Sequence, residues 1–128
     1  MVKILLVEDD QNLANLTHIA LVKKGFEVIV FHEAGQALEE IKEQKPDLIL
    51  MDVMLPDLSG PEAVKVLRKN PDLMNIPVIF LTALLSKEES ELGLTVDKVN
   101  YKTLGKPYEI NHLLELIKIS LPYSEDNK

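Results

Sequence analysis

Four short stretches of this sequence carry side chains that could act together in one site, and each stretch follows an apolar run. Glu8 and Asp9 follow the run ILLV, and the run LILM ends on Asp52. The run VIFL ends on Thr82, and Lys106 follows a weaker run near the C-terminus. A charge at the end of a buried strand is costly unless another group compensates it. These five residues are therefore the first candidates for a functional site.

The side chains of this set indicate cation and phosphoryl chemistry. The carboxylates of Glu8, Asp9 and Asp52 would repel one another unless a cation lay between them. Oxygen ligands without a thiolate suit a hard cation, and Mg²⁺ suits them best if it keeps some of its waters. A carboxylate can also attack phosphorus and form an aspartyl phosphate. The Lys106 ammonium could then neutralise phosphoryl oxygens, and the Thr82 hydroxyl could bind one of them.

The elements that must position these residues alternate along the chain. Four apolar runs predict strands that are covered on both faces, as in a parallel sheet. These runs lie at residues 2–7, 27–31, 47–52 and 77–82. Residues 99–104 are of mixed polarity and predict a fifth strand at the edge of the sheet. The polar residues named above then all lie at the carboxyl ends of strands, where doubly wound sheets bind their ligands.

Helix-period segments separate the predicted strands. Leu13, Leu16 and Ala20 lie at helical spacing, and Asp10 is a suitable N-cap before them. Further stripes predict helices near residues 34–41, 61–67 and 110–121, with Pro61 in a first turn. Ser86 with Glu89 predicts a capping box for a short helix between the fourth and fifth strands. The alternation predicts an α/β fold of the (βα)5 type, a doubly wound five-stranded parallel sheet.

Composition and length limit the classes of function. The chain has 128 residues, which predicts one domain at 1–122 followed by a polar tail at 123–128, with no second domain after it. The net charge of −7 and the scattered lysines argue against direct nucleic acid binding. No apolar run approaches the ~18 residues of a membrane span, and no cleavable signal sequence is evident. With no cysteine present, a cytoplasmic protein is expected.

The sequence resembles the response-regulator receiver domains of the CheY-like type. ILLVEDD resembles the acidic motif of that family, and LILMDVMLPDLSG resembles its phosphoacceptor loop. FLTA resembles its hydroxyl motif, and GKPY resembles its lysine–proline motif. The similarity covers essentially the whole chain. It implies the flavodoxin-like strand order 2-1-3-4-5 and a role in two-component signal transduction.

The resemblance implies a role for each site residue. Asp52 would accept a phosphoryl group from a phosphohistidine, and Thr82 and Lys106 would bind that group. Asp9, Asp52 and the backbone carbonyl of Met54 would bind Mg²⁺ directly, whereas Glu8 would act through a metal-bound water. The phosphoryl donor would be a sensor histidine kinase or a histidine phosphotransfer protein. The chain would then be a signalling switch, which assists its own phosphorylation and dephosphorylation, and not a metabolic enzyme.

The output of such a switch would pass through a downstream protein effector. Phosphorylation would shift the surface around the fourth helix and the fifth strand. Family members often carry an aromatic residue three positions before the lysine, where this chain has Thr103. Tyr101 lies two residues earlier and so on the same face of the strand. We therefore expect Tyr101 to be the residue that moves on phosphorylation.

Other functions remain open at this stage. A receiver-like module that is never phosphorylated, and only docks to partners, is the main alternative. An aspartate-nucleophile phosphohydrolase is less suitable, because such enzymes usually carry a second aspartate where this chain has Met54. A flavin-binding relative is also less suitable, since the first loop holds acids where phosphate-binding donors would be needed.

Overall fold

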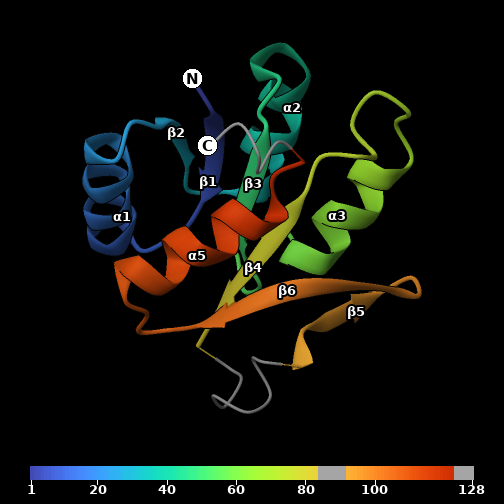
Figure 1. Ribbon diagram of the computed structural model, residues 1–128. Coiled ribbons are helices and arrows are strands. Elements are labelled where there is room, and N and C mark those ends of the chain that lie inside the picture. The colour runs from blue at the N-terminus through green and yellow to red at the C-terminus, as the bar shows by residue number, and fades with distance from the viewer. Residues whose placement is uncertain (84–91, 123–128) are drawn as a thin grey trace.

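A six-stranded sheet runs through the centre of the computed structural model, which describes residues 1–83 and 92–122 (Figure 1). The order across the sheet is β2-β1-β3-β4-β6-β5, and all neighbours pair in parallel except β5 and β6. The predicted doubly wound α/β fold with a flavodoxin-like order is confirmed, with β6 in the place of the expected fifth strand. The strands are β1 (Lys3–Val7), β2 (Glu27–Phe31), β3 (Leu48–Asp52), β4 (Val78–Thr82), β5 (Leu94–Val96) and β6 (Val99–Gly105).

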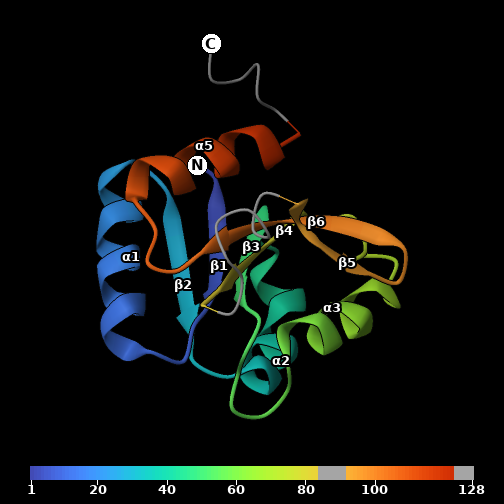
Figure 2. The same cartoon turned by 90° about the horizontal axis from the view of Figure 1, so that it is seen from below.

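Helices cover the sheet on both faces (Figure 2). In the described ranges they are α1 (Gln11–Lys23), α2 (Ala34–Gln44), α3 (Gly60–Arg68) and α5 (Ile110–Ser120). One buried cluster joins α1 and α5 to side chains such as Leu6 of the sheet. The other cluster joins α2 and α3 to side chains such as Phe80. Every residue of β3 and β4 is buried, as predicted for strands that are covered on both faces.

The helices α1 and α3 follow the loops that begin at the site, and local hydrogen bonds fix where each helix starts. The Asp10 side chain accepts a hydrogen bond from the Leu13 N–H at 3.1 Å, so it is the N-cap of α1 as predicted. Ser59 and Glu62 form a capping box at the start of α3, where Pro61 occupies the first turn. These caps set where each loop at the site ends.

The antiparallel hairpin of β5 and β6 is a feature that the sequence interpretation did not include. Val96 pairs with Val99 across a two-residue turn, in which Asp97 and Lys98 have φ angles of 49° and 70°. Positive φ at both central residues is typical of tight hairpins that follow the twist of the strands. The prediction of an edge strand at 99–104 was wrong, because β5 pairs with the first part of β6 and itself lies at the edge.

Two sequence predictions lie outside the described residues. They are the short helix capped by Ser86 and Glu89, and the polar tail at 123–128. Within residues 1–83 and 92–122, no helix has the length and apolar character needed to cross a membrane.

Candidate functional site

The carboxyl ends of β1 and β3 come out side by side because the two strands are parallel and in register. Val7 at the end of β1 pairs with Met51 of β3, so the residues that follow, Glu8 and Asp52, are neighbours. Asp52 in turn lies beside Leu81 of β4. The sheet thus brings together acids that are more than forty positions apart in the sequence.

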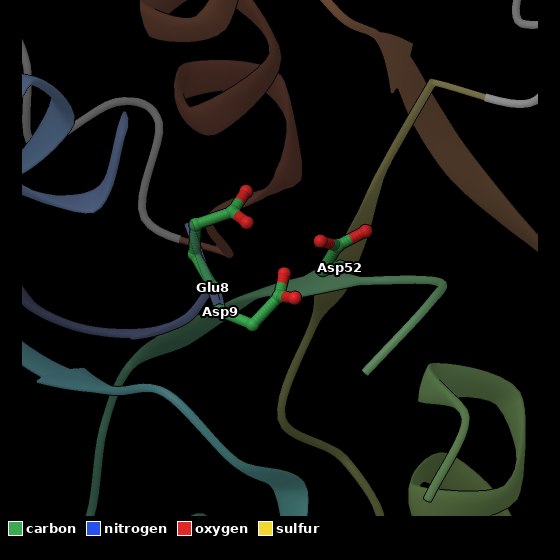
Figure 3. Close-up of side chains that lie close together, drawn as sticks. All are labelled: Glu8, Asp9 and Asp52. Atoms are coloured by element: carbon green, nitrogen blue, oxygen red, sulfur yellow. The ribbon is translucent and has the colours of Figure 1, made fainter. Parts of the chain in front are cut away.

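The side chains of Glu8, Asp9 and Asp52 point toward one another (Figure 3). One oxygen atom from each carboxylate lies within 4.8 Å of the other two. Glu8 and Asp52 are only 1% and 5% exposed, whereas Asp9 is exposed to solvent. Three carboxylate oxygens with one open side are a ligand set that could hold a hard cation and leave room for water.

Lys106 supplies the positive charge that these buried acids need. Its ammonium nitrogen lies 2.8 Å from Asp52 Oδ2, to which it donates a hydrogen bond, and 2.5 Å from Glu8 Oε1. The lysine side chain is itself 16% exposed. A single ammonium between two carboxylates compensates part of their charge, so Asp52 can remain at the end of a buried strand.

One buried oxygen of this cluster has the Lys106 ammonium as its partner in the described part of the chain. Glu8 Oε1 forms an ion pair with Lys106, and no second donor reaches it among residues 1–83 and 92–122. A carboxylate oxygen has more than one lone pair, so this oxygen can also accept a hydrogen bond from a water. A water carried by a cation could donate to this oxygen. The donor set therefore fits Mg²⁺, which binds proteins through a few carboxylates and keeps several of its waters.

The environment of the cluster changes the protonation of two of its members. Burial raises the pKa of Glu8 to about 7, an effect that the neighbouring Asp52 charge reinforces and that hydrogen bonds from Lys106 and the Asp10 N–H oppose. Burial alone would lower the pKa of Lys106. The hydrogen bonds and charges of Asp52 and Glu8 outweigh it, so that pKa is raised. The lysine therefore stays charged throughout the physiological range.

Thr82 lies at the end of a strand that borders the acidic cluster, and Met54 lies on the loop beside it. Thr82 is the last residue of β4 and is 1% exposed, and its carbonyl accepts a hydrogen bond from the Lys106 N–H at 2.8 Å. This backbone bond places the lysine beside the site. The Met54 N–H donates to Asp52 Oδ1 at 3.2 Å, while the Met54 side chain extends into solvent. The loop after β3 therefore turns back over the Asp52 carboxylate.

Two residues near the site were not singled out by the sequence interpretation. His32 directly follows β2, and its Nδ1 lies 2.8 Å from the Glu8 carbonyl oxygen. Its position just beyond a strand end was a signal that could have identified it. Asp57 lies in the loop after β3, and its carboxylate accepts hydrogen bonds from the first N–H groups of α2. Its partners are more than twenty residues away in the sequence, and no local pattern indicates them.

The fold and this site define an α/β protein with an acidic cluster and a lysine at the carboxyl edge of its sheet. The family model described as "Response regulator receiver domain" matches residues 4–118. The chain therefore belongs to the receiver domain family of response regulators. It is homologous to regulators of two-component systems such as the DNA-binding response regulator MtrA of Mycolicibacterium smegmatis. Identity to that protein is 34% over 124 residues, which make up 97% of this chain and 52% of MtrA.

Solved structures of receiver domains are similar over almost their whole length. The receiver domain of the Francisella response regulator 1452 has a TM-score of 0.79 and 31% identity, with full coverage of both chains. The receiver domain of the sensor histidine kinase PA1611 from Pseudomonas aeruginosa has a TM-score of 0.81 and 28% identity, and covers 93% of this chain and 96% of its own. That structure has a magnesium ion coordinated in its active site cleft. The chain spans about half the length of the curated relatives it matches.

Proposed function

We propose that this receiver domain accepts a phosphoryl group on Asp52 with the help of Mg²⁺, and that this modification changes which protein partner it binds. The observation that carries the proposal is the placement of Lys106, whose ammonium contacts Asp52 and Glu8 at the edge where three carboxylates meet. A structural ion pair would need only one acid. Here the lysine contacts two acids and a third, Asp9, lies beside them, which leaves excess negative charge that suits a divalent cation.

In the transfer, a carboxylate oxygen of Asp52 forms a bond to phosphorus as the bond between phosphorus and the donor's imidazole nitrogen breaks. The imidazole leaves with the electron pair of that bond. Lys106, which holds Asp52 at 2.8 Å, lies where it can bind the oxygens of the incoming group. The Thr82 hydroxyl at the end of β4 is the second group that would bind them. Both act by electrostatic stabilisation of the charge on the transferred group.

Asp9, Asp52 and the carbonyl of Met54 would hold Mg²⁺ directly, and Glu8 would hold it through water. When bound, the ion would neutralise the carboxylates and the phosphoryl oxygens, so that an anionic donor can approach an anionic site. The exposed position of Asp9 supports its role as a direct ligand, and the remaining lone pair of Glu8 Oε1, which pairs with Lys106, supports a contact through water. The protein's own part is to keep these oxygens close together before the ion arrives.

The phosphoryl donor would be a sensor histidine kinase or a histidine phosphotransfer protein, and the recipient of the signal would be a protein effector. The chain would be a switch and not a metabolic enzyme. Family membership supports these partners in general terms, because response regulators are two-component proteins. The alternative of a docking module that is never phosphorylated is less consistent with the complete set of three acids and a lysine.

Thermal unfolding with ligands tests the proposed site. Mg²⁺ and beryllium fluoride, a mimic of the phosphoryl group, should each bind the folded site and not the unfolded chain. A ligand at a hundredfold excess over its dissociation constant adds ~2.7 kcal/mol to the free energy of unfolding. The pair should therefore raise the melting temperature more than Mg²⁺ alone, and Asp52→Ala should abolish the additional rise. Identical melting curves with and without both ligands would contradict the proposal.

A further inference from the structure

The loop at residues 53–59, between β3 and α3, needs a fixed position if its backbone is to serve the cation site. It contains Met54, whose N–H already contacts Asp52. The start of the loop is fastened to the sheet, since the Val53 N–H donates to the Leu81 carbonyl at 2.9 Å. Its end is fastened by the capping box of α3. Between these two points the loop makes a further contact with the rest of the protein, through Asp57.

Asp57 joins the middle of the loop to a different helix, α2. Its Oδ1 and Oδ2 accept hydrogen bonds from the N–H groups of Ala34 and Gly35, at 3.0 and 2.7 Å. The residue at the N-cap position of α2 itself, Glu33, makes no side-chain cap hydrogen bond. Asp57 thus caps α2 from outside that helix, where a negative charge also interacts favourably with the helix dipole. The hydrogen bonds from Gly35 and Ala34 lower the pKa of Asp57, which keeps the carboxylate ionised.

The segment that contacts Asp57 also contacts the backbone at Glu8. This segment, residues 31–35, runs from the last residue of β2 into the first turn of α2. The Glu8 N–H donates to the Phe31 carbonyl at 2.9 Å, and His32 Nδ1 lies 2.8 Å from the Glu8 carbonyl oxygen. The same segment therefore contacts the backbone of Glu8 and, through Asp57, the loop that contains Met54.

The fit between Asp57 and α2 depends on a glycine. A Cβ atom at Gly35 would lie only 2.9 Å from Asp57 Oδ2, closer than side chains tolerate. Because Gly35 is in the first turn of a helix, alanine there would favour the helix itself. Alanine at this position would nevertheless push the Asp57 carboxylate away. Gly35→Ala therefore separates two effects: it favours α2 itself, but it displaces the Asp57 carboxylate from the start of that helix.

We propose that Asp57 is a positioning residue for the cation site: through its two hydrogen bonds to the start of α2, it fixes the 53–59 loop relative to the backbone of Glu8. This inference rests on the proposed function, because it assumes that Mg²⁺ binds among Glu8, Asp9 and Asp52. It adds a residue that touches neither the cation nor the phosphoryl group. Asp57 acts through the position of the Met54 backbone.

The test compares Asp57→Asn with a matched control, Asp47→Asn. The Asp47 carboxylate also accepts a backbone N–H, that of Lys3 at 2.8 Å, but at the opposite end of the sheet. Asparagine retains one acceptor oxygen, so Asp57→Asn loses one of its two bonds and its charge. We expect the Mg²⁺ dissociation constant of Asp57→Asn, measured by isothermal titration calorimetry, to rise about tenfold, the lower end of the range for groups that support metal ligands. Asp47→Asn should lower the melting temperature but leave that constant unchanged.

Gly35→Ala supplies the second, independent perturbation. It should raise the Mg²⁺ dissociation constant, as Asp57→Asn does, although alanine favours the helix. The double variant of Gly35→Ala and Asp57→Asn should have the same dissociation constant as Asp57→Asn alone. A wild-type chain that binds Mg²⁺, together with an Asp57→Asn variant of equal affinity, would overturn the positioning role and leave the proposed function standing. A wild-type chain that binds no Mg²⁺ would overturn both. A rise in the dissociation constant of Asp47→Asn equal to that of Asp57→Asn would also overturn it, since the effect would then be one of general stability.

Discussion

Glu8→Gln should stabilise the metal-free protein at alkaline pH, although it removes a partner of Lys106. The Glu8 carboxyl is buried, and its pKa rises from an ordinary 4.5 to about 7 in the folded state. A group whose folded pKa is raised contributes most stability below its unfolded pKa, and this contribution is lost as the pH rises through the folded value. The wild-type protein therefore loses free energy of unfolding between about pH 4.5 and pH 7 through this one group.

The size of this effect follows from the shift. One pKa unit corresponds to 1.36 kcal/mol, so the full shift would be worth ~3 kcal/mol, and screening by water at the open edge of the site reduces this to about 1–2 kcal/mol. Glutamine has the shape of the protonated acid and does not titrate. The free energy of unfolding of Glu8→Gln, minus that of the wild type, should increase by this amount from pH 4.5 to pH 8.

Urea denaturation without Mg²⁺, at several pH values, measures this difference directly. The histidines and the other acids contribute to the pH dependence of the free energy of unfolding in both the wild type and Glu8→Gln, so their contributions cancel in the difference. With saturating Mg²⁺ the sign should reverse, because the wild-type carboxylate then has a cation to satisfy it. A difference in the free energy of unfolding that stays constant from pH 4.5 to pH 8 would refute the claim that Glu8 is held in an unfavourable charged state.

Three further substitutions test how the site is supported. Gly60→Ala should destabilise the fold by about 1–3 kcal/mol in urea denaturation, the range of overpacked sites, because the new Cβ would clash with the Asp52 carbonyl oxygen. Arg68→Met should cost about 2–3 kcal/mol in the same assay, since the guanidinium donates to the Tyr101 hydroxyl and to two carbonyls of the loop before β4. Tyr101→Ala should still accept a phosphoryl group on Asp52, but it should lose the phosphorylation-dependent chemical-shift changes along β6 in NMR spectra. Unaltered shift changes would exclude Tyr101 as the switch residue.

The site could be predicted from the sequence because its geometry follows from a simple rule. Residues that end parallel strands meet at one edge, whatever their separation along the chain. Asp52 and Lys106 satisfy this rule through the pairing of β3 with β4 and of β4 with β6. The pattern of apolar runs was sufficient to predict these strands, since their buried residues are almost all Val, Ile, Leu, Met or Phe.

The hairpin could not be predicted in the same way. Tight hairpins are usually indicated by Asn-Gly or Asp-Gly, whereas this turn is made by Asp97 and Lys98, and Lys98 adopts positive φ without being glycine. The burial of Tyr101 was also not evident from the sequence. Tyr101 is 7% exposed, stacks edge-on against Phe80 and accepts a hydrogen bond from Arg68. The structure therefore places the expected switch residue in the buried arrangement.

Helix faces were predicted less well than strands. Leu16 belongs to the residues at helical spacing that predicted α1, but it is 67% exposed. The buried residues are Ala14, Thr17 and Leu21, which lie three and four residues apart. A threonine was not counted as a core residue, although its hydroxyl can bond across the core, here with the Tyr108 hydroxyl at 2.7 Å. Long-range polar contacts of this kind have no signature in a single sequence.

The most direct test of the central claim is the intact mass of the protein after incubation with a small phosphodonor such as acetyl phosphate. With Mg²⁺ present, the wild-type chain should gain the mass of one phosphoryl group, and the label should be lost in mild acid or base as expected of an acyl phosphate. Chelation of the metal should prevent the gain, and so should Asp52→Asn. Undiminished labelling of Asp52→Asn, or the absence of any gain in the wild type, would contradict the assignment of Asp52 as the phosphoacceptor.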